Sequence, residues 1–598
     1  MTLVNFSWAL ISTILFPTFI SDETLGFSNS IFSIVFFTGI YVVLWKVSKQ
    51  HNDRRLNIYS HIIGFLFSFM IATGHALDVY GEISFRRIFV SIIFYTHIIA
   101  ALISLLWKLL IDTELKMNLK SSQKKVTVII EKAVMWLLQH PYMIMVFLLL
   151  CWLPCFIADF PGGFRYDATG ELYQIKDGYN GNYPLLHSVI ITRLLPFCFN
   201  LTGSYNTGIA VYVMAQMIMV SCMYAHIIST FGKKGINKVI VFIVLLYCGL
   251  FPVVQIMVVQ EVRDILFSAF VMYAVFLFYL MASDKKTFFS SFLKPMILGV
   301  VFVLALLARN NNAGNAMLII VVAISVIIWV INRKQYFRGA TIFLVTSITS
   351  YLLLGAILTA LCQPLMPANV GGSLSIMSQP IIRAYLYEKE SWNDEDVAEL
   401  GKYINLDGIT YCAENADLTK YRVHVQDNFG DFFKFWMKIG FKHPGCYCDA
   451  ILANTQNMWY PDSVIDGYKQ VFKEEGQPYY EYEKCYYSIN NETEEPAVHM
   501  NLWPKALDYY TQIGLFISFE KIPIVSMLFS IGFQFWIILN SLFYVVYRKA
   551  KKLILPIAII LGYMLISACV PLVLARYFAA AFFAFPMLLI FTLQPNRL

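Results

Sequence analysis

Charged residues are scarce in this sequence. Asp, Glu, Lys and Arg make up 14% of its 598 residues, whereas soluble domains carry about 25%. Hydrophobic residues reach 58% and aromatic residues 16%, with a mean hydropathy of +0.62. A soluble fold has too few polar side chains at this composition to cover its apolar surface. The values therefore exclude a soluble globular protein and a disordered chain, and they predict a polytopic membrane protein.

The sequence also lacks a basic cluster and the usual motifs of soluble enzymes. The net charge is +7, but the basic residues are not gathered on one soluble domain, which argues against nucleic acid as a partner. We find no phosphate-binding Gly-x4-Gly-Lys-Ser/Thr, no dinucleotide-binding glycine pattern and no His-Glu-x2-His zinc motif. The first apolar stretch lacks a basic leader and a small-residue cleavage site, so no cleavable signal peptide is expected.

Long apolar runs set the expected architecture. About fourteen stretches are long enough to cross a bilayer, which takes about 17–20 helical residues. They lie at 8–21, 29–46, 57–76, 88–111, 141–160, 207–230, 238–258, 262–282, 292–308, 313–332, 340–362, 521–546, 551–573 and 576–594. We therefore expect an all-α polytopic membrane protein with a mixed polar domain inserted before the last three spans. Its parts are an accessory four-span module at 1–135, a transmembrane core at 136–363, the polar domain at 364–520 and C-terminal helices at 521–598.

The charged residues predict an orientation. Basic connections such as 47–56, 112–133 and 548–552 fall on one side of the membrane if the number of spans is even, and both termini join them. That side is cytoplasmic by the positive-inside rule. The polar domain holds 12 of the 45 basic and 23 of the 38 acidic residues, a net charge of −11 against +18 elsewhere. We expect this domain, and a site beside it, on the extracytoplasmic face of the cell membrane.

The loop at 160–186 carries the first candidate residues. Pro161-Gly162-Gly163 directly follows a span and predicts a tight turn that keeps Asp167 near the membrane surface. An ionised group there is costly unless it is paired or functional, and a carboxylate in such a loop can serve as a general base. The candidates are Asp167 and Asp159 as catalytic carboxylates, with Arg165, Tyr166, Gln174 and His187 as substrate-binding residues. The alternative is a loop of solvated acids in which His187 caps a helix predicted at 185–198.

Two further groups stand at the same ends of spans. Glu261, Arg263 and Asp264 open a span, and the two acids share a helix face because they are three residues apart. They predict a second carboxylate for a divalent cation or an acceptor hydroxyl, or acids that only stabilise a helix N-terminus. Arg309 and Arg576 stand at outer span ends, where a guanidinium group either binds phosphate or snorkels to the interface.

The polar domain contains one clear aromatic helix and four cysteines. Phe432, Phe433, Trp436 and Ile439 have helical spacing, and the aromatic face predicts a helix that lies on the membrane surface or on the bundle. The cysteines are Cys412, Cys446, Cys448 and Cys485. On an oxidising face they predict two disulfides or free thiols. Zinc is less favoured, since Cys-x-Cys lacks the usual ligand spacing.

These residues form an ordered series that resembles one class of membrane enzyme. The series comprises Pro161-Gly162, Tyr166-Asp167, Gln174, Tyr183-Pro184-Leu185-Leu186-His187, Arg263-Asp264, Arg309-Asn310-Asn311, Gln379-Pro380-Ile381-Ile382-Arg383, Asp417-x2-Lys420, Trp436, His443-Pro444, Trp459-Tyr460-Pro461 and Arg576-Tyr577. From about 141 to 594 the chain is similar to the GT-C class of membrane glycosyltransferases, in particular to a bacterial multi-spanning branch. The four spans before 141 lie outside this common core.

The resemblance implies an inverting enzyme that moves a hexosyl or pentosyl group from a polyprenyl-phosphate carrier to an extracytoplasmic glycan or lipid acceptor. By position, Asp167 resembles the loop carboxylate of the class and would be the general base, with Asp159 as the fallback. The paired acids common in that loop are absent, because Ala168 follows Asp167. No cofactor is therefore certain, and a divalent cation, Mg²⁺ or Mn²⁺, stays open.

Two other functions fit the same spans. A cell-surface polysaccharide polymerase or ligase would share the lipid-linked substrate and would depend on Arg383 and His499 in the polar domain. A lipid-linked sugar flippase, which is not an enzyme, would carry ionisable groups at mid-membrane together with internal repeats. Neither of those two features is apparent in the sequence.

Overall fold

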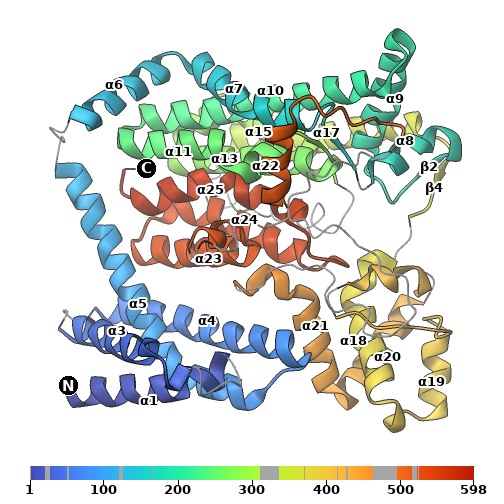
Figure 1. Ribbon diagram of the computed structural model, residues 1–598. Coiled ribbons are helices and arrows are strands. Elements are labelled where there is room, and N and C mark those ends of the chain that lie inside the picture. The colour runs from blue at the N-terminus through green and yellow to red at the C-terminus, as the bar shows by residue number, and fades with distance from the viewer. Residues whose placement is uncertain are drawn as a thin grey trace.

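A computed structural model shows a bundle of helices with most of the polar domain at one end, while the last helix of that domain, at 504–514, packs against the helix at 141–158 (Figure 1). The structure describes residues 2–20, 27–49, 53–119, 125–165, 167–309, 336–368, 371–413, 415–425, 428–461, 495–514 and 524–597, together with positions 323, 327, 331 and 522. Two predicted site or cysteine residues, Tyr166 and Cys485, lie outside this description. So does the predicted span at 313–332, except for positions 323, 327 and 331.

The elements follow in chain order. The N-terminal helices are α1 (Thr2–Ile20), α3 (Ile31–Ser48), α4 (Arg54–Tyr80), α5 (Phe85–Leu119) and α6 (Lys125–Gln139). The core elements are α7 (Pro141–Ala158), β1 (Gly163–Phe164), α8 (Ala168–Asp177), β2 (Tyr179–Asn180), α9 (Leu185–Thr202), α10 (Tyr205–Lys233), α11 (Lys238–Leu250), α12 (Pro252–Val258), β3 (Gln260–Glu261), α13 (Arg263–Ser283), α14 (Lys285–Ser290), α15 (Leu293–Leu307), α17 (Phe337–Leu361) and β4 (Leu365–Met366).

The polar domain and the last helices complete the chain. The polar domain contains the 3-10 helix η1 (Gly371–Leu374), α18 (Ser375–Tyr387), η2 (Lys389–Ser391), α19 (Asp394–Gly401), η3 (Ala416–Leu418), η4 (Lys420–Arg422), α20 (Phe429–Lys442), α21 (Pro444–Trp459) and α22 (Pro504–Gly514). The C-terminal elements are η5 (Ser526–Phe529), α23 (Ile531–Tyr547), α24 (Lys551–Ser567), η6 (Ala575–Phe578) and α25 (Ala579–Leu593).

The protein is an all-α membrane protein with several helices of membrane-spanning length. Within the described ranges, nine helices are long and apolar enough to cross a bilayer, or ten if one bent pair counts as a span. They are α3, α4, the part of α5 up to Lys116, α7, α9, α10, α13, α17 and η6 with α25, and the bent pair is α11 with α12. Other predicted spans coincide with shorter apolar helices, because the apolar run in the sequence includes turn residues that the helix does not.

The bend between α11 and α12 corrects one predicted span. The sequence places a single span at 238–258, but the two helices meet there at 50°. Pro252 opens α12 and lacks the N–H that would continue α11. A hydropathy average over this run does not reveal the break, because Pro252 is flanked by apolar residues on both sides.

Helix α9 is longer than predicted and forms a hairpin with α10. It extends to Thr202, and Gly203 in the left-handed conformation joins it to α10. His187 near its start contacts Tyr212, about two turns into α10. A Cβ atom on Gly162, just beyond α7, would meet Val213. The hairpin formed by α9 and the first turns of α10 therefore projects past the end of α7, and α9 also packs against α17.

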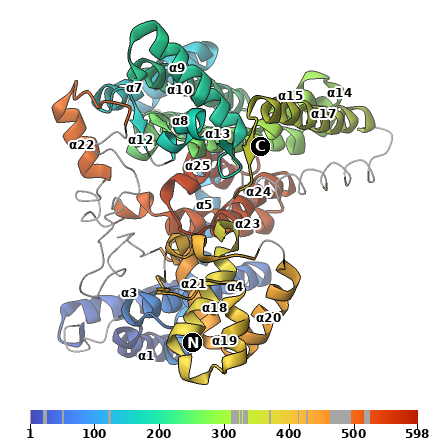
Figure 2. The same ribbon diagram turned by 90° about the vertical axis from the view of Figure 1, so that its right-hand side faces the viewer.

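The bundle is built around α13. This helix has no Pro or Gly and is apolar on all sides, as expected for a helix that is surrounded by others. It packs against α10, α15, α24 and α25. Figures 1 and 2 show the C-terminal helices α23–α25 between the core helices and the N-terminal α1, α3 and α4. We call the end of the bundle with Ala158, Arg263 and Gly81 the polar end, and the end with Lys234, Glu114 and Arg548 the basic end.

The N-terminal module is attached to the C-terminal helices at the basic end. Glu114 of α5 is buried and accepts a hydrogen bond from Arg548 Nη2 at 2.7 Å and another from the Asn596 side chain at 3.2 Å. Trp107 of the same helix donates to Asn540 Oδ1 at 3.0 Å. Polar contacts of this kind fix the position of α5 against α23 and α25.

The polar domain has a hydrophobic core of its own. Ile381 and Ile382 of α18 are buried with Leu400 of α19 and with Phe432 and Ile439 of α20. The predicted aromatic helix is therefore correct, but its two faces differ, because Phe432 is buried and Phe433 is exposed. Within the described ranges, no disulfide joins Cys412, Cys446 and Cys448 to one another.

Candidate functional site

A short parallel strand pair brings the first loop to the start of α13. Gly163 and Phe164 of β1 pair with Gln260 and Glu261 of β3. Gly162, directly before β1, has a φ of +118°, and a Cβ atom there would lie 2.6 Å from the Val213 side chain. Only glycine fits both conditions. The Pro-Gly-Gly turn predicted from the sequence thus presses the loop onto α10 and places Asp167 beside Arg263.

Asp167 is the accessible carboxylate of the site. Its side chain is 33% exposed, and its Oδ2 lies 2.8 Å from Arg263 Nη2 and 3.6 Å from Arg576 Nη2. Both ion pairs fall on Oδ2, and within the described ranges Oδ1 has no ion pair or hydrogen bond. Burial raises the pKa of this carboxyl, but Arg263 and then Arg576 and Lys420 outweigh burial, so its pKa lies below the ordinary value. The Asp167 carboxylate is therefore ionised at neutral pH.

A fully buried chain of acids and one imidazole lies behind Arg263. Glu171 Oε1 is 3.2 Å from Arg263 Nη1, and Glu171 Oε2 is 2.6 Å from His187 Nδ1. The other ring nitrogen of His187 lies 3.0 Å from the Tyr212 hydroxyl and 3.3 Å from Glu261 Oε1. The side chains of Glu171, His187 and Glu261 are at most 1% exposed. His187 does not cap α9, so the capping interpretation is wrong.

Asp264 organises two arginines from distant parts of the chain. Its Oδ1 lies 3.2 Å from Arg309 Nε and its Oδ2 lies 3.7 Å from Arg576 Nε. The ring of Tyr577 stacks with both guanidinium groups, with their Cζ atoms 4.6 Å and 5.0 Å from the ring centroid. Asp264 is 1% exposed, whereas Arg309 and Arg576 are 6% and 8% exposed. The two guanidinium groups are thus held by a carboxylate that solvent barely reaches.

The polar domain contributes a lysine above this cluster. Lys420 of η4 forms an ion pair with Asp417 at 3.0 Å and lowers the pKa of Asp167 electrostatically. Ala416, the first residue of η3, donates from its backbone N–H to Pro571 O at 2.8 Å, which links this part of the domain to the loop that precedes Arg576. The site is therefore built from the bundle and the polar domain together.

Six of the predicted site residues come together in this cluster. They are Asp167, His187, Glu261, Arg263, Asp264 and Arg576, and Arg309 joins them through Asp264. Tyr166 lies outside the described residues. Gln174 is buried and braces the loop, since its Nε2 donates to Ser188 Oγ at 3.0 Å and its Oε1 accepts from the Asn180 N–H at 3.1 Å.

Three predicted residues have other partners. Asp159, the alternative candidate for the general base, is fully buried and forms an ion pair with Arg165 at 2.9 Å. Arg383 pairs with Asp449 at 3.1 Å and donates to Gly81 O at 2.9 Å, so it fastens the polar domain to the turn between α4 and α5. These contacts explain the positions of Asp159, Arg165 and Arg383 without assigning them a substrate.

Four members of the cluster are missing from the sequence-based list of sites. They are Glu171, Tyr212, Lys420 and Tyr577. Glu171 follows Asp167 by four residues and shares its helix face, a spacing that could have identified it. Tyr212 has no local signal, because it is one of many aromatic residues in an apolar helix.

The described part of the cluster does not contain a ready-made set of metal ligands. Within the described ranges, no group of three or more His, Cys, Asp and Glu side chains has the geometry to hold a metal ion. The carboxylates of the cluster face guanidinium groups and an imidazole instead of one another.

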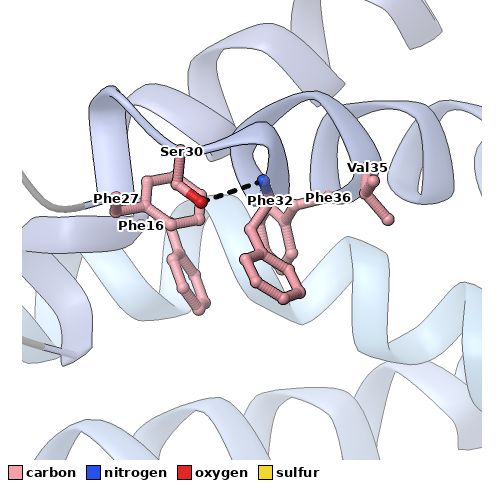
Figure 3. A pocket seen from close by; sticks show the side chains of 6 residues that line it. All are labelled: Phe16, Phe27, Ser30, Phe32, Val35 and Phe36. Atoms are coloured by element: carbon pink, nitrogen blue, oxygen red, sulfur yellow. Dashed lines mark hydrogen bonds between the residues drawn. The ribbon is translucent and has the colours of Figure 1, made fainter.

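An apolar pocket lies away from the charged cluster. It has a volume of about 450 Å³ and lies between α1 and α3 (Figure 3). Its lining residues are Phe16, Phe27, Ser30, Phe32, Val35 and Phe36. The one polar side chain, Ser30, is used as the N-cap of α3. The pocket therefore offers no group for acid-base chemistry.

One known protein family matches a region of the chain that includes most residues of the charged cluster. Residues 179–597 match the model of a family of unknown function, DUF6020. The chain belongs to the DUF6020 family. The DUF6020 region contains His187, Arg263, Arg309 and Arg576, whereas Asp167 precedes it. No curated protein and no solved structure matches the chain.

Proposed function

We propose that the protein is an inverting membrane glycosyltransferase of the GT-C type that uses a polyprenyl-phosphate-linked sugar. The observation that carries the proposal is the accessible Asp167 carboxylate beside the guanidinium groups of Arg263 and Arg576. The reaction needs a base for the acceptor hydroxyl and cations for the leaving phosphate. This arrangement supplies both within one cluster at the polar end of an apolar bundle.

Arg309 and Arg576 are the proposed ligands of the lipid phosphate. Asp264 approaches each of them at Nε, and Nη2 of Arg576 contacts Asp167 Oδ2 and the Tyr577 hydroxyl, which an incoming phosphate would have to displace. Arg309 Nη1 makes no hydrogen bond to any described residue. Guanidinium groups donate parallel hydrogen bonds to phosphate oxygens, and they stabilise developing charge more strongly where water is excluded.

The proposed reaction is a direct displacement. The acceptor hydroxyl oxygen attacks the anomeric carbon as the bond from that carbon to the phosphate oxygen breaks. The hydroxyl proton passes to Asp167, and the bonding electron pair stays on the lipid phosphate beside Arg309 and Arg576. Arg263 keeps Asp167 ionised before the transfer, which is why this carboxylate, and not a protonated acid, faces the acceptor.

The proposed setting is the cell membrane, with the site on the extracytoplasmic face and about fourteen spans around it. The cluster lies at the end of the bundle opposite Lys234 and Arg548, in agreement with the positive-inside rule. A polyprenyl chain would lie among the apolar helices, and the acidic polar domain would receive the glycan or lipid acceptor.

Replacement of Asp167 by Asn tests the proposal. The purified protein is reconstituted into liposomes with a polyprenyl-phosphate sugar donor and a membrane glycan extract, and transfer of labelled sugar is measured. Loss of a general base lowers the rate by about 10²–10⁴, so we expect D167N to lose at least the lower figure. Asp177→Asn, at the exposed end of the same helix α8, is the matched control and should transfer at the unaltered rate.

A polymerase or ligase is the second candidate, favoured by one observation. His499 lies 3.9 Å from Asp159 and is 9% exposed, which gives a buried imidazole next to a buried carboxylate. Burial lowers the pKa of His499, so the ring is neutral at pH 7. If H499A abolishes transfer while D167N transfers normally, the ligase proposal replaces the glycosyltransferase proposal.

A further inference from the structure

Helix α20 of the polar domain has two apolar faces, and only one of them is covered. Phe432, Phe435 and Ile439 are buried in the core of the domain. A second row at intervals of four residues consists of Phe429, Phe433, Met437 and Phe441, which are 50%, 45%, 37% and 80% exposed. Residues four apart lie above one another on a helix, so this exposed row is continuous along the whole of α20.

A row of lysines follows the exposed aromatic row. Lys434, Lys438 and Lys442 each stand one position after a member of that row. Lys438 and Lys442 both hold Asp396 of α19, which is 3% exposed, while their own side chains are 56% and 42% exposed. Asp396 is therefore hidden beneath these two lysines. Lys434 pairs with the exposed Asp431 at 3.1 Å, so the surface of α20 carries three ammonium groups and one carboxylate.

The next helix fixes the height of α20 above the bundle. In α21, Asp449 accepts a hydrogen bond from the Ile83 N–H at the turn between α4 and α5, and Tyr460 lies against Gly74 of α4. The end of α4 is thus level with Asp449. Six residues of helix separate Asp449 from His443, where α20 ends, so at 1.5 Å per residue the end of α20 lies within about 9 Å of that level.

That height matches the headgroup layer of a bilayer. The hydrocarbon core is about 30 Å thick and the whole bilayer about 40–45 Å, which leaves several ångströms of headgroups on each side. Helices that lie in this layer typically combine a Phe- and Leu-rich face with lysines beside it. Figure 2 places α20 at the margin of the polar domain, where lipid and not bundle would lie beneath it.

We infer that α20 is an interfacial helix whose row of Phe429, Phe433, Met437 and Phe441 inserts into the surface of the surrounding bilayer. Lys434, Lys438 and Lys442 then lie at the level of the lipid phosphates and donate to their oxygens. The helix would hold the polar domain against the membrane, so that Lys420 on the same domain stays over the cluster at Asp167. The inference rests on the surface of α20 and on its position near the turn between α4 and α5, and it does not depend on the proposed enzymatic activity.

Site-specific photo-cross-linking tests this inference in the full-length protein. A photoactivatable phenylalanine analogue replaces Phe433 or Phe441, and the protein is reconstituted into nanodiscs of fluorescent phosphatidylcholine, with or without phosphatidylglycerol. We expect lipid label on the protein at both positions, and more of it when the anionic lipid is present, because lysines near the surface attract anionic headgroups. The matched control is the same analogue at Lys402, which is 66% exposed on the neighbouring α19 and should take up no label.

Three results would overturn the inference. One is the absence of lipid label at Phe433 and Phe441 in monodisperse protein. Another is equal label at Lys402, which would make contact with lipid a general property of the polar domain. The third is a cross-linked band at twice the chain mass, which would assign the exposed row to an interface between two copies of the chain.

Discussion

Replacement of Asp264 by Asn should destabilise the fold far more than the same change at Asp167. Both carboxylates pair with Arg576, at 3.7 and 3.6 Å, but the side chain of Asp264 is 1% exposed and that of Asp167 is 33% exposed. Asp264 also holds Arg309. Removal of one partner from a buried ion pair leaves an unpaired buried charge and costs about 3–5 kcal/mol. A pair within reach of solvent contributes about 0–1 kcal/mol.

The measurement compares D264N and D167N directly. Asn has nearly the same volume as Asp, so neither change adds a cavity, and the difference reports the lost charge. Free energies of unfolding are obtained for both variants and the unaltered protein from detergent titrations followed by far-ultraviolet circular dichroism. A difference between the variants of less than about 0.5 kcal/mol, the usual range for surface substitutions, would refute the conclusion that Asp264 is the structural anchor of the two arginines.

Two further predictions concern helix packing and pH. A Cβ atom on Gly64 would lie 2.6 Å from the backbone oxygen of Thr96. Gly64→Ala should therefore force α4 and α5 apart and lower the free energy of unfolding by about 1–3 kcal/mol. The control is Gly39→Ala, where a Cβ atom meets open space, and this change should not destabilise the protein. Arg263 lowers the pKa of Asp167, and a general base works only above its pKa. R263Q should therefore move the acid limb of the pH–rate profile to higher pH. An acid limb that does not move would contradict the role of Asp167.

The sequence alone was sufficient for the class of protein and for much of the cluster. Apolar runs and scarce charge predict a helical membrane protein, because both follow from local composition. The rarity of charge also drew attention to Asp167, Arg263 and Asp264, since ionised residues at span ends are few. That argument selects residues one at a time and needs no knowledge of their partners.

The partners themselves were beyond sequence reasoning. Arg263 and Glu171 are 92 residues apart in the sequence. Their contact depends on the pairing of β1 with β3. The sequence offers Arg576 as an arginine at a span end and Arg383 as one in the polar domain, but the fold places Arg383 against Asp449 and Gly81. A guanidinium group that fastens two segments together and one that faces a substrate have the same sequence signal, and burial by distant elements separates them.

The burial gradient across the cluster indicates how its parts cooperate in the proposed reaction. Glu171 and Asp264 are 1% exposed and bind guanidinium groups from behind, the buried Glu261 contacts His187, and Asp167 alone among the four acids is accessible. A lipid phosphate that engages Arg576 competes with Asp167 for that guanidinium group. The loss of one of its cations raises the pKa of Asp167 from its depressed value and makes the carboxylate a stronger base. Binding of the donor would thus activate the base that receives the acceptor proton, and Arg263 would hold Asp167 in place throughout.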